Sequence, residues 1–364
     1  MKDLIAPENL SPIELAKRLM NFKGMAASSR DFEKIKNHLV PSHALERINQ
    51  IVKGLEQEDE FAVLCRVMET CTSLSRIDQN PIIRGEEKSP DFLATFEPGC
   101  SVTGKTRDNI RLKYNCLIEV KSCKAKKFKI SEKDLKRRKS YAMRYKLPLV
   151  FAVRFTLFES HSYWILVESS RLEKQGRKIE IDSLVGNLGP ALFDDYGVFT
   201  HPQLCFAHYY DNISNKNGIR HQVHGVLFRT TMLLPDQDPI DINEEHSVLI
   251  NAFIDAFDFE QLHIEKSGSI TVVVSNIGNQ MRFLGDLVYR VNNLAREESG
   301  TPTYDATRVI SSIDSHSAKP ALITRSMIEH AIYLLNRHVI VMFKIGIGER
   351  DEQEKILRSL ARNS

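Results

Sequence analysis

The residues Leu117-Ile118-Glu119-Val120-Lys121 end a segment, 110–121, in which polar and apolar residues alternate as they do along a β-strand. Glu119 and Lys121 are two residues apart, so both project from the face opposite the apolar one. The pattern therefore predicts a strand that presents a carboxylate and an ammonium group side by side. The apolar residues that alternate onto its other face are Leu112, Tyr114, Cys116, Ile118 and Val120.

The segments on either side of this strand also have recognisable patterns. Asp91 follows Pro90 at the start of an apolar run, and Ser131 can cap a helix. In chain order, the predicted elements are a strand over 90–96, a loop over 98–109, the strand of Glu119, a helix over 132–145, and apolar strands over 147–155 and 163–167.

This order of elements, with Asp91, Glu119 and Lys121 at the motif positions, resembles the catalytic core of the PD-(D/E)XK nuclease superfamily, which has the restriction-endonuclease-like fold. The resemblance covers about residues 58–170 and leaves the C-terminal half untouched. It implies an α/β core with a mixed central sheet flanked by helices. It also implies a metal-dependent nuclease, expected to be an endonuclease that hydrolyses phosphodiester bonds.

Phosphodiester hydrolysis requires a divalent metal ion, which neutralises the charge that develops on the phosphate and supplies hydroxide near neutral pH. Carboxylates are natural ligands for Mg²⁺, so Asp91 and Glu119 are expected to hold Mg²⁺ or Mn²⁺. The resemblance adds the backbone carbonyl of Val120 as a third ligand. It also implies that Lys121 orients the attacking water or helps to deprotonate it. A salt bridge on a sheet face is the structural alternative for Lys121.

Members of the superfamily often carry a further acid on the helix before the first core strand. A helix predicted from Glu58 places Glu60 and Glu69 beside its apolar face. Either residue is a candidate for the metal site, and the sequence does not decide between them. The alternative for each is a glutamate that faces solvent.

Positive charge is concentrated directly after the motif. Between Glu119 and Lys146 there are twelve Lys and Arg against three Asp and Glu, a local charge of +9 in a chain whose net charge is +3. Such a block predicts contact with a polyanion, although a solvated helix face is the alternative. DNA is expected rather than RNA, because most relatives of this fold act on DNA. The residues expected to hold its phosphates are Lys124, Lys126, Lys127, Lys133, Lys136, Arg137 and Lys139.

The length of 364 residues predicts two or three domains. Residues 1–57 are expected to be a helical N-terminal region, and residues 58–200 the nuclease-like domain. A loop-rich stretch near residue 200 marks the boundary to a mixed α+β domain over 201–364, whose role the sequence does not indicate. In this last domain, strands are predicted over 204–210, 223–234, 270–275 and 339–345, and helices over 247–257, 285–296, 325–337 and 352–361.

The composition predicts a cytoplasmic protein. No apolar run approaches the length that spans a bilayer, and the N-terminus shows no apolar signal core. The six cysteines are scattered without CxxC spacing, as expected of free thiols in a reducing compartment. Many members of the superfamily dimerise, so a homodimer is one expectation, and a protein partner that binds through the C-terminal domain is another.

Other interpretations remain open. One is a non-catalytic nucleic-acid-binding module of the same fold. Another is a P-loop nucleotide hydrolase, because residues 99–106 match G-x-x-x-x-G-K-[ST]; the strand-like residues that follow disfavour it. Cys205, His208, His221 and His224 have a spacing that suggests zinc. Each pair lies in strand-like sequence, where residues three apart face opposite sides, so the sequence predicts that the members of each pair diverge.

Overall fold

The computed structural model describes most of the chain and divides it into two compact units. The first unit contains the described residues up to Asp194 and those between 306 and 322, and the second contains Asp195 to Glu298 and residues 323–343. The described residues are 11–26, 29–78, 86–98, 113–158, 161–181, 187–214, 220–235, 238–258, 260–298, 306–307, 309–310, 322–336 and 341–343.

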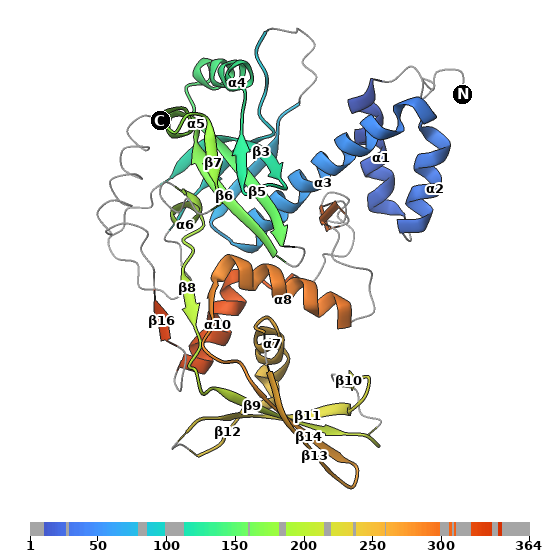
Figure 1. Ribbon diagram of the computed structural model, residues 1–364, viewed down its shortest axis with the longest axis vertical. Helices are drawn as coiled ribbons and strands as arrows, with labels where there is room; N and C mark the ends of the chain where they lie inside the picture. Colours follow the sequence, from blue (N-terminus) through green and yellow to red (C-terminus); the bar gives the residue numbers. More distant parts are fainter. Residues whose placement is uncertain are drawn as a thin grey trace. The chain divides into compact units, whose positions relative to one another are not determined.

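The first unit begins with helices that pack around a long third helix (Figure 1). Ser11 caps the first helix through the backbone N–H of Glu14, as its position before Pro12 predicts. Apolar residues of all three helices form one buried cluster, which includes Leu19, Phe32 and Val52. The helices are α1 (Pro12–Met25), α2 (Ser29–Leu39), a short 3₁₀ turn (Ser42–Ala44) and α3 (Leu45–Val67).

The expectation of a separate helix from Glu58 is wrong, because α3 runs through that position without a break. Gly54 is a weak helix former near the expected gap, and an isolated glycine costs a helix only about 1 kcal/mol. Apolar residues on both sides of Gly54 are buried, so packing along the whole helix outweighs that cost.

A mixed sheet forms the centre of the first unit, as predicted. Within the described ranges its strands lie in the order β1-β2-β3-β5-β6, and only β3 and β5 are parallel. The helix α4 (Glu132–Arg144) connects these two, and Ser131 caps it. The strands are β1 (Cys71–Arg76), β2 (Phe92–Phe96), β3 (Tyr114–Cys123), β5 (Leu149–Phe158) and β6 (His161–Glu168); a small ribbon joins β4 (Lys127–Lys129) to β7 (Lys178–Glu180).

Helices cover both faces of this sheet. Leu117 of β3 and Phe151 of β5 belong to a buried cluster with Leu135 and Ala142 of α4. On α3, the ring of Phe61 contacts Phe92, Trp164 and Phe193 at centroid distances of 5.3–6.4 Å. Glu119 and Lys121 share the face of Leu117, so the fold directs them toward α4. Two further helices of the unit are short, α5 (Ser169–Lys174) and α6 (Gly189–Leu192).

The second unit is mixed α and β, as predicted. Its largest described sheet is antiparallel, in the order β10-β11-β9-β14-β13 with β12 paired to β11. These strands are β9 (Cys205–Asp211), β10 (Arg220–His221), β11 (Gly225–Leu233), β12 (Ile240–Asp241), β13 (Glu260–Ser267) and β14 (Ile270–Asn276). A second sheet pairs β8 (Gly197–Phe199) with β15 (Met281–Phe283) and β16 (Val341–Phe343); the helices are α7 (Glu244–Asp255), α8 (Leu284–Glu298) and α10 (Arg325–Asn336).

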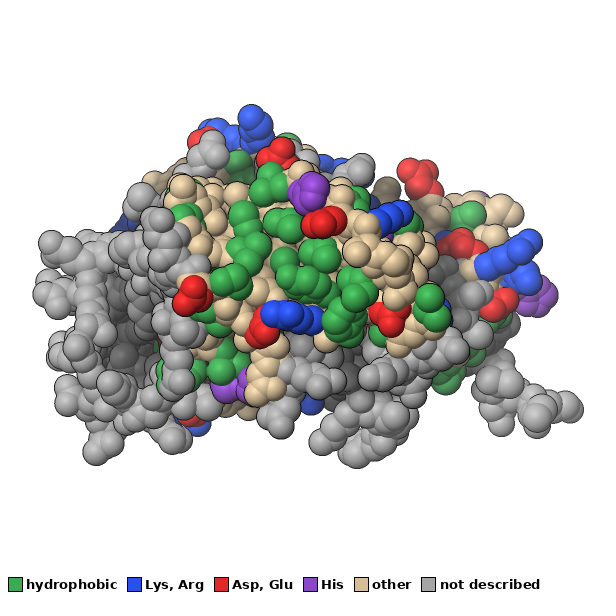
Figure 2. All heavy atoms as spheres, turned by 90° about the horizontal axis from the view of Figure 1, so that it is seen from below, with side chains coloured by type: hydrophobic (Ala, Val, Ile, Leu, Met, Phe, Trp, Pro, Cys, Tyr) green, Lys and Arg blue, Asp and Glu red, His purple; other side chains and the backbone are tan. Residues whose placement is uncertain are grey.

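The larger sheet of the second unit has one covered and one open face. Thr230 of β11 is hydrogen-bonded to Asn251 of α7 at 3.1 Å, which identifies the face under the helix. Figure 2 views the opposite side and shows hydrophobic side chains gathered there over the strands. Phe228 is 51% exposed, and its ring centroid lies 6.3 Å from that of Tyr209. The strand β13 was not predicted.

Within the described ranges, no helix is long and apolar enough to cross a membrane. The five cysteines that the structure describes are free thiols. The predicted helix over 352–361 lies outside the described residues.

Candidate nuclease-like site

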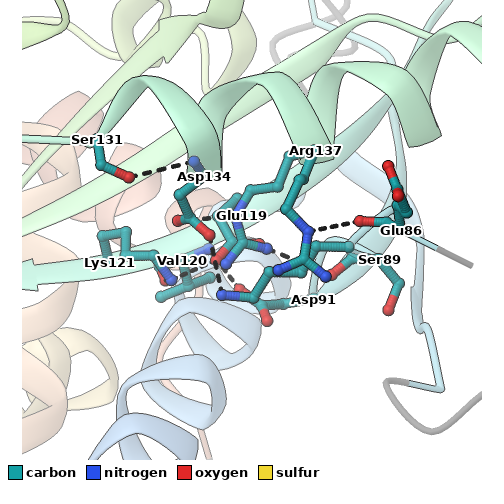
Figure 3. A network of polar contacts seen from close by, with 11 residues as sticks. Glu86, Ser89, Asp91, Glu119, Val120, Lys121, Ser131, Asp134 and Arg137 are labelled. Atoms are coloured by element: carbon teal, nitrogen blue, oxygen red, sulfur yellow. Dashed lines mark hydrogen bonds and ion pairs between the residues drawn. The ribbon is translucent and has the colours of Figure 1, made fainter.

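The structure brings Asp91 to the middle of β3. Asp91 directly precedes β2, and its backbone N–H donates to the carbonyl oxygen of Ile118 at 2.9 Å. Its side-chain Oδ2 accepts the backbone N–H of Val120 at 2.7 Å. Asp91 is buried, so this hydrogen bond satisfies part of its carboxylate where water cannot. The hairpin register therefore places the Asp91 carboxylate beside the residue between Glu119 and Lys121 (Figure 3).

Glu119 and Lys121 lie together, as the strand pattern predicts. The Nζ atom of Lys121 is in an ion pair with Oε1 of Glu119, and it also donates to the carbonyl oxygen of Val120 at 3.2 Å. Glu119 is buried, whereas the Lys121 side chain is 31% exposed. The ammonium group thus lies at the boundary between the buried carboxylate and solvent.

Arg138 is a member of this cluster that the sequence analysis missed. It extends from the inward face of α4, and its Nη1 lies 2.5 Å from Oε2 of Glu119. The signal was its spacing: Arg138 follows the buried Leu135 by three residues and precedes the buried Ala142 by four, so it belongs to the inward stripe of the helix. Arg138 stands in a run of lysines and arginines, so the sequence suggested that it belongs to an exposed basic face.

Glu58 is an acid of α3 that interacts with the site. The negative charges of Asp91 and Glu119 repel its carboxylate, and its Oε2 lies 3.4 Å from Nη1 of Arg76 on β1. Glu60 instead forms an ion pair with Arg154 of β5 at 2.8 Å.

Glu69, the other acid considered from the sequence, is exposed in the turn after α3, with φ at 59°. The sequence signal for Glu58 was its place on the buried stripe, because it precedes Phe61, Ala62 and Cys65 by three, four and seven residues.

Burial changes the protonation of the two glutamates. Burial raises the pKa of Glu119 to about 7, although the positive charge of Lys121 opposes the change. Burial, reinforced by the negative charge of Asp91, raises the pKa of Glu58 to about 8. Carboxylates that are poorly solvated and repel one another gain from a nearby cation.

The donor atoms are chemically suited to a hard divalent cation. Asp91, Glu119 and the Val120 carbonyl supply oxygen ligands of the kind that Mg²⁺ takes, and Glu58 adds a further carboxylate nearby. In their present positions, however, no three His, Cys, Asp or Glu residues of the described ranges form a group that could hold a metal ion. Both oxygens of Glu119 are instead engaged by Lys121 and Arg138. The residues fit such an ion in kind, and holding one requires a change in these ion pairs.

The predicted phosphate-binding residues fall into two groups. Lys127 pairs with Glu180 and Lys139 with Glu173, while Arg137 donates to the carbonyl oxygen of Glu86. The remaining four are exposed, and none forms an ion pair with another described residue: Lys124, Lys126, Lys133 and Lys136. These four lie in the turn after β3 and on the first half of α4, and they have charge available for an anion.

The two alternative motifs are placed differently by the structure. The P-loop-like residues 99–106 lie outside the described residues, but Tyr114–Cys123 is a strand, as the nuclease interpretation requires. The prediction that His221 and His224 diverge is wrong, because their rings stack at 4.5 Å. The reason is that β10 ends at His221 and a turn follows, so strand alternation does not apply.

The stacked histidines already use one ring nitrogen in the turn. Nδ1 of His221 accepts the backbone N–H groups of Val223 and His224, at 3.1 and 3.2 Å. Accepting at Nδ1 leaves the ring proton on Nε2, so in this arrangement neither nitrogen of neutral His221 offers a lone pair to zinc. Cys205 and His208 belong to β9, where residues three apart face opposite sides.

Comparisons with known proteins add little to this description. No family model matches the chain, and neither does any protein with curated information. Among solved structures, the chain is similar to Hjc, a Holliday junction resolvase from the archaeon Archaeoglobus fulgidus. The two are 16% identical over 35% of this chain and 88% of that chain, with a TM-score of 0.25. A TM-score this low does not establish a common fold.

Proposed function

We propose that the protein is a metal-dependent nuclease, with DNA as its substrate. The observation that carries the proposal is the position of Asp91, whose carboxylate is hydrogen-bonded to Val120 between Glu119 and Lys121. The hairpin thus unites an aspartate, a glutamate and a lysine that are up to 30 residues apart in the chain. DNA is preferred to RNA because most members of the superfamily that the motif resembles act on DNA.

Asp91, Glu119 and the Val120 carbonyl would hold a divalent cation such as Mg²⁺ or Mn²⁺, and Glu58 would be a further acid of the same site. Such an ion lowers the pKa of a bound water and offsets the charge that develops on the phosphate. Lys121 extends from the buried carboxylate toward solvent, so its Nζ can donate a hydrogen bond that orients the attacking water. The four exposed lysines near the site would bind phosphates, and this contribution weakens as salt is added.

A second function is favoured by one observation. Both oxygens of Glu119 carry ion pairs, to Lys121 and Arg138, and a carboxylate held in this way can serve structure alone. A non-catalytic nucleic-acid-binding module would retain such a cluster. It would bind DNA to the same extent with and without Mg²⁺.

The test is cleavage of supercoiled plasmid DNA with Mg²⁺ or Mn²⁺, compared with EDTA and with Asp91→Asn. The asparagine can still accept the N–H of Val120, so the fold is expected to survive while a charged ligand is lost. Metal-dependent nicking that disappears in the variant supports the nuclease. Nicking that survives the substitution would contradict the site, and DNA binding without any nicking would favour the second function.

Glu58→Gln is expected to raise the Mg²⁺ concentration for half-maximal cleavage by about 10-fold, because a bound cation would draw the Glu58 carboxyl into its charged form beside Asp91 and Glu119, and glutamine cannot ionise. Glu60→Gln is the matched control, two residues away on the same helix and paired with Arg154. A Mg²⁺ titration of the cleavage rate would measure both. A shift in Glu60→Gln with none in Glu58→Gln would instead favour Glu60, one of the two acids that the sequence suggested.

A further inference from the structure

The guanidinium group of Arg138 is almost entirely enclosed. Its side chain is 2% exposed, and that of its partner Glu119 is 1% exposed. Burying two charges removes both from water, and the pair is stable only if its geometry and its further hydrogen bonds are good. The contacts made by Arg138 therefore indicate what the residue does.

Arg138 touches both sides of the carboxylate cluster. Nη1 contacts Oε2 of Glu119 and also lies 3.4 Å from the carbonyl oxygen of Ser89, two residues before Asp91. Its Nε lies 3.4 Å from Oδ2 of Asp134, one turn earlier on α4. A single planar group thus connects α4 to Glu119 and to the chain that leads into Asp91.

Neighbouring contacts attach the same chain segment to α4. The Nζ atom of Lys88 lies 3.1 Å from Oδ1 of Asp134, and its backbone N–H donates to the carbonyl oxygen of Arg137 at 3.3 Å. The Arg137 side chain donates to the carbonyl oxygen of Glu86 (Figure 3). The segment before Asp91 is therefore attached to α4 by contacts that do not involve Arg138. Among these described contacts, only those of Arg138 also include Glu119.

We propose that Arg138 is a positioning residue, which keeps Oε2 of Glu119 and the backbone before Asp91 in place while a divalent cation takes the place of Lys121 at Oε1. The inference rests on the proposed function, since it concerns the metal ligands named there. Arginine suits the task because its flat fork of N–H donors reaches two acceptors in fixed directions. Lysine keeps the charge but has a single donor atom, so Arg138→Lys separates geometry from charge.

The experiment is calorimetric titration with Ca²⁺, which takes oxygen ligands as Mg²⁺ does and is read without any cleavage. The full chain is compared with Asp91→Asn, Arg138→Lys and Arg137→Lys. The last is the matched control, because it makes the same substitution one residue away in a side chain for which the structure shows no contact with Glu119. We expect Arg138→Lys to bind Ca²⁺ about 10-fold more weakly, and Arg137→Lys to match the parent protein.

The results separate this inference from the proposed function. If the parent protein binds Ca²⁺, Asp91→Asn does not, and folded Arg138→Lys binds as tightly as the parent, the positioning role is overturned and the metal site stands. If Asp91→Asn binds Ca²⁺ as well as the parent does, the proposed site itself fails, and the positioning role with it.

A second variant covers the case in which Arg138→Lys does not fold. Asp134→Asn removes the other carboxylate that contacts the guanidinium at a side chain that is 29% exposed. It is expected to weaken Ca²⁺ binding several-fold by the same loss of orientation. Unchanged binding in this variant would overturn the inference.

Discussion

Lys121→Met is expected to slow metal-dependent DNA cleavage by at least about 100-fold, the lower end of what a positioned proton-transfer group contributes. Methionine keeps an apolar stem of similar length and removes the ammonium group that lies beside Glu119. The Glu119 carboxylate remains paired with Arg138, so its buried charge still has a partner of opposite charge. The loss should therefore be specific to the reaction and leave the fold intact.

Single-turnover cleavage rates would measure this effect, together with the DNA affinity, which should change little, and the Ca²⁺ affinity, which should not fall because Lys121 no longer competes for Glu119. Lys136→Met is the matched control, since Lys136 is exposed on α4 and forms no ion pair with another described residue. We expect it to weaken DNA binding and reduce its salt dependence while leaving the rate at saturating DNA nearly unchanged. A Lys121→Met protein that cleaves at the parental rate would remove Lys121 from the reaction.

Phe61→Ala is expected to lower the free energy of unfolding of the first unit by about 3–5 kcal/mol. The ring is fully buried and contacts Phe92, Trp164 and Phe193, so its removal leaves a cavity between α3 and the sheet. The substitution should also weaken metal binding, because Glu58 lies one turn before Phe61 on the same face of α3.

Trp164 provides the measurement, since it is the single tryptophan of the chain and its ring lies 5.3 Å from that of Phe61. Urea unfolding followed by its fluorescence should report the loss directly. Phe61→Leu is the control and should cost less than about 1.5 kcal/mol, because it preserves most of the volume. An equal loss of stability in the two variants would mean that the surrounding side chains fill the space left by the ring, and it would contradict the expected cavity.

The parts of the fold that were predicted correctly are those that local pattern specifies. The alternation around Glu119 predicted β3, and the position of Ser131 predicted the start of α4, because capping and side-chain period act over a few residues. The strand β13 was missed because all eight of its residues are exposed. A strand at the edge of a sheet need not bury either face, and the short alternation of Leu262 and Ile264 is too brief to mark this one.

The site was predicted only in part, for a related reason. Asp91, Glu119 and Lys121 stand at motif positions, and the hairpin register that unites them follows from the two strands. Glu58 and Arg138 come from helices, and which side of each helix meets the sheet depends on packing between distant segments. Both residues lie on the apolar stripe of a helix, where the sequence analysis expected no charged member of the site.

Because α3 is unbroken, it limits where the protein can be truncated without disturbing the site. The helix is about 35 Å long, and its first half packs with α1 and α2 while its second half packs on the sheet. A fragment that started at residue 58 would place Glu58 in the first turn of a truncated helix, where backbone N–H groups lack partners and the end frays. The acid on α3 that faces Asp91 and Glu119 would then occupy the least ordered turn of the fragment. The helices α1 and α2 supply none of the proposed ligands. By packing on the first half of α3 they nevertheless keep Glu58 in an ordered part of the helix.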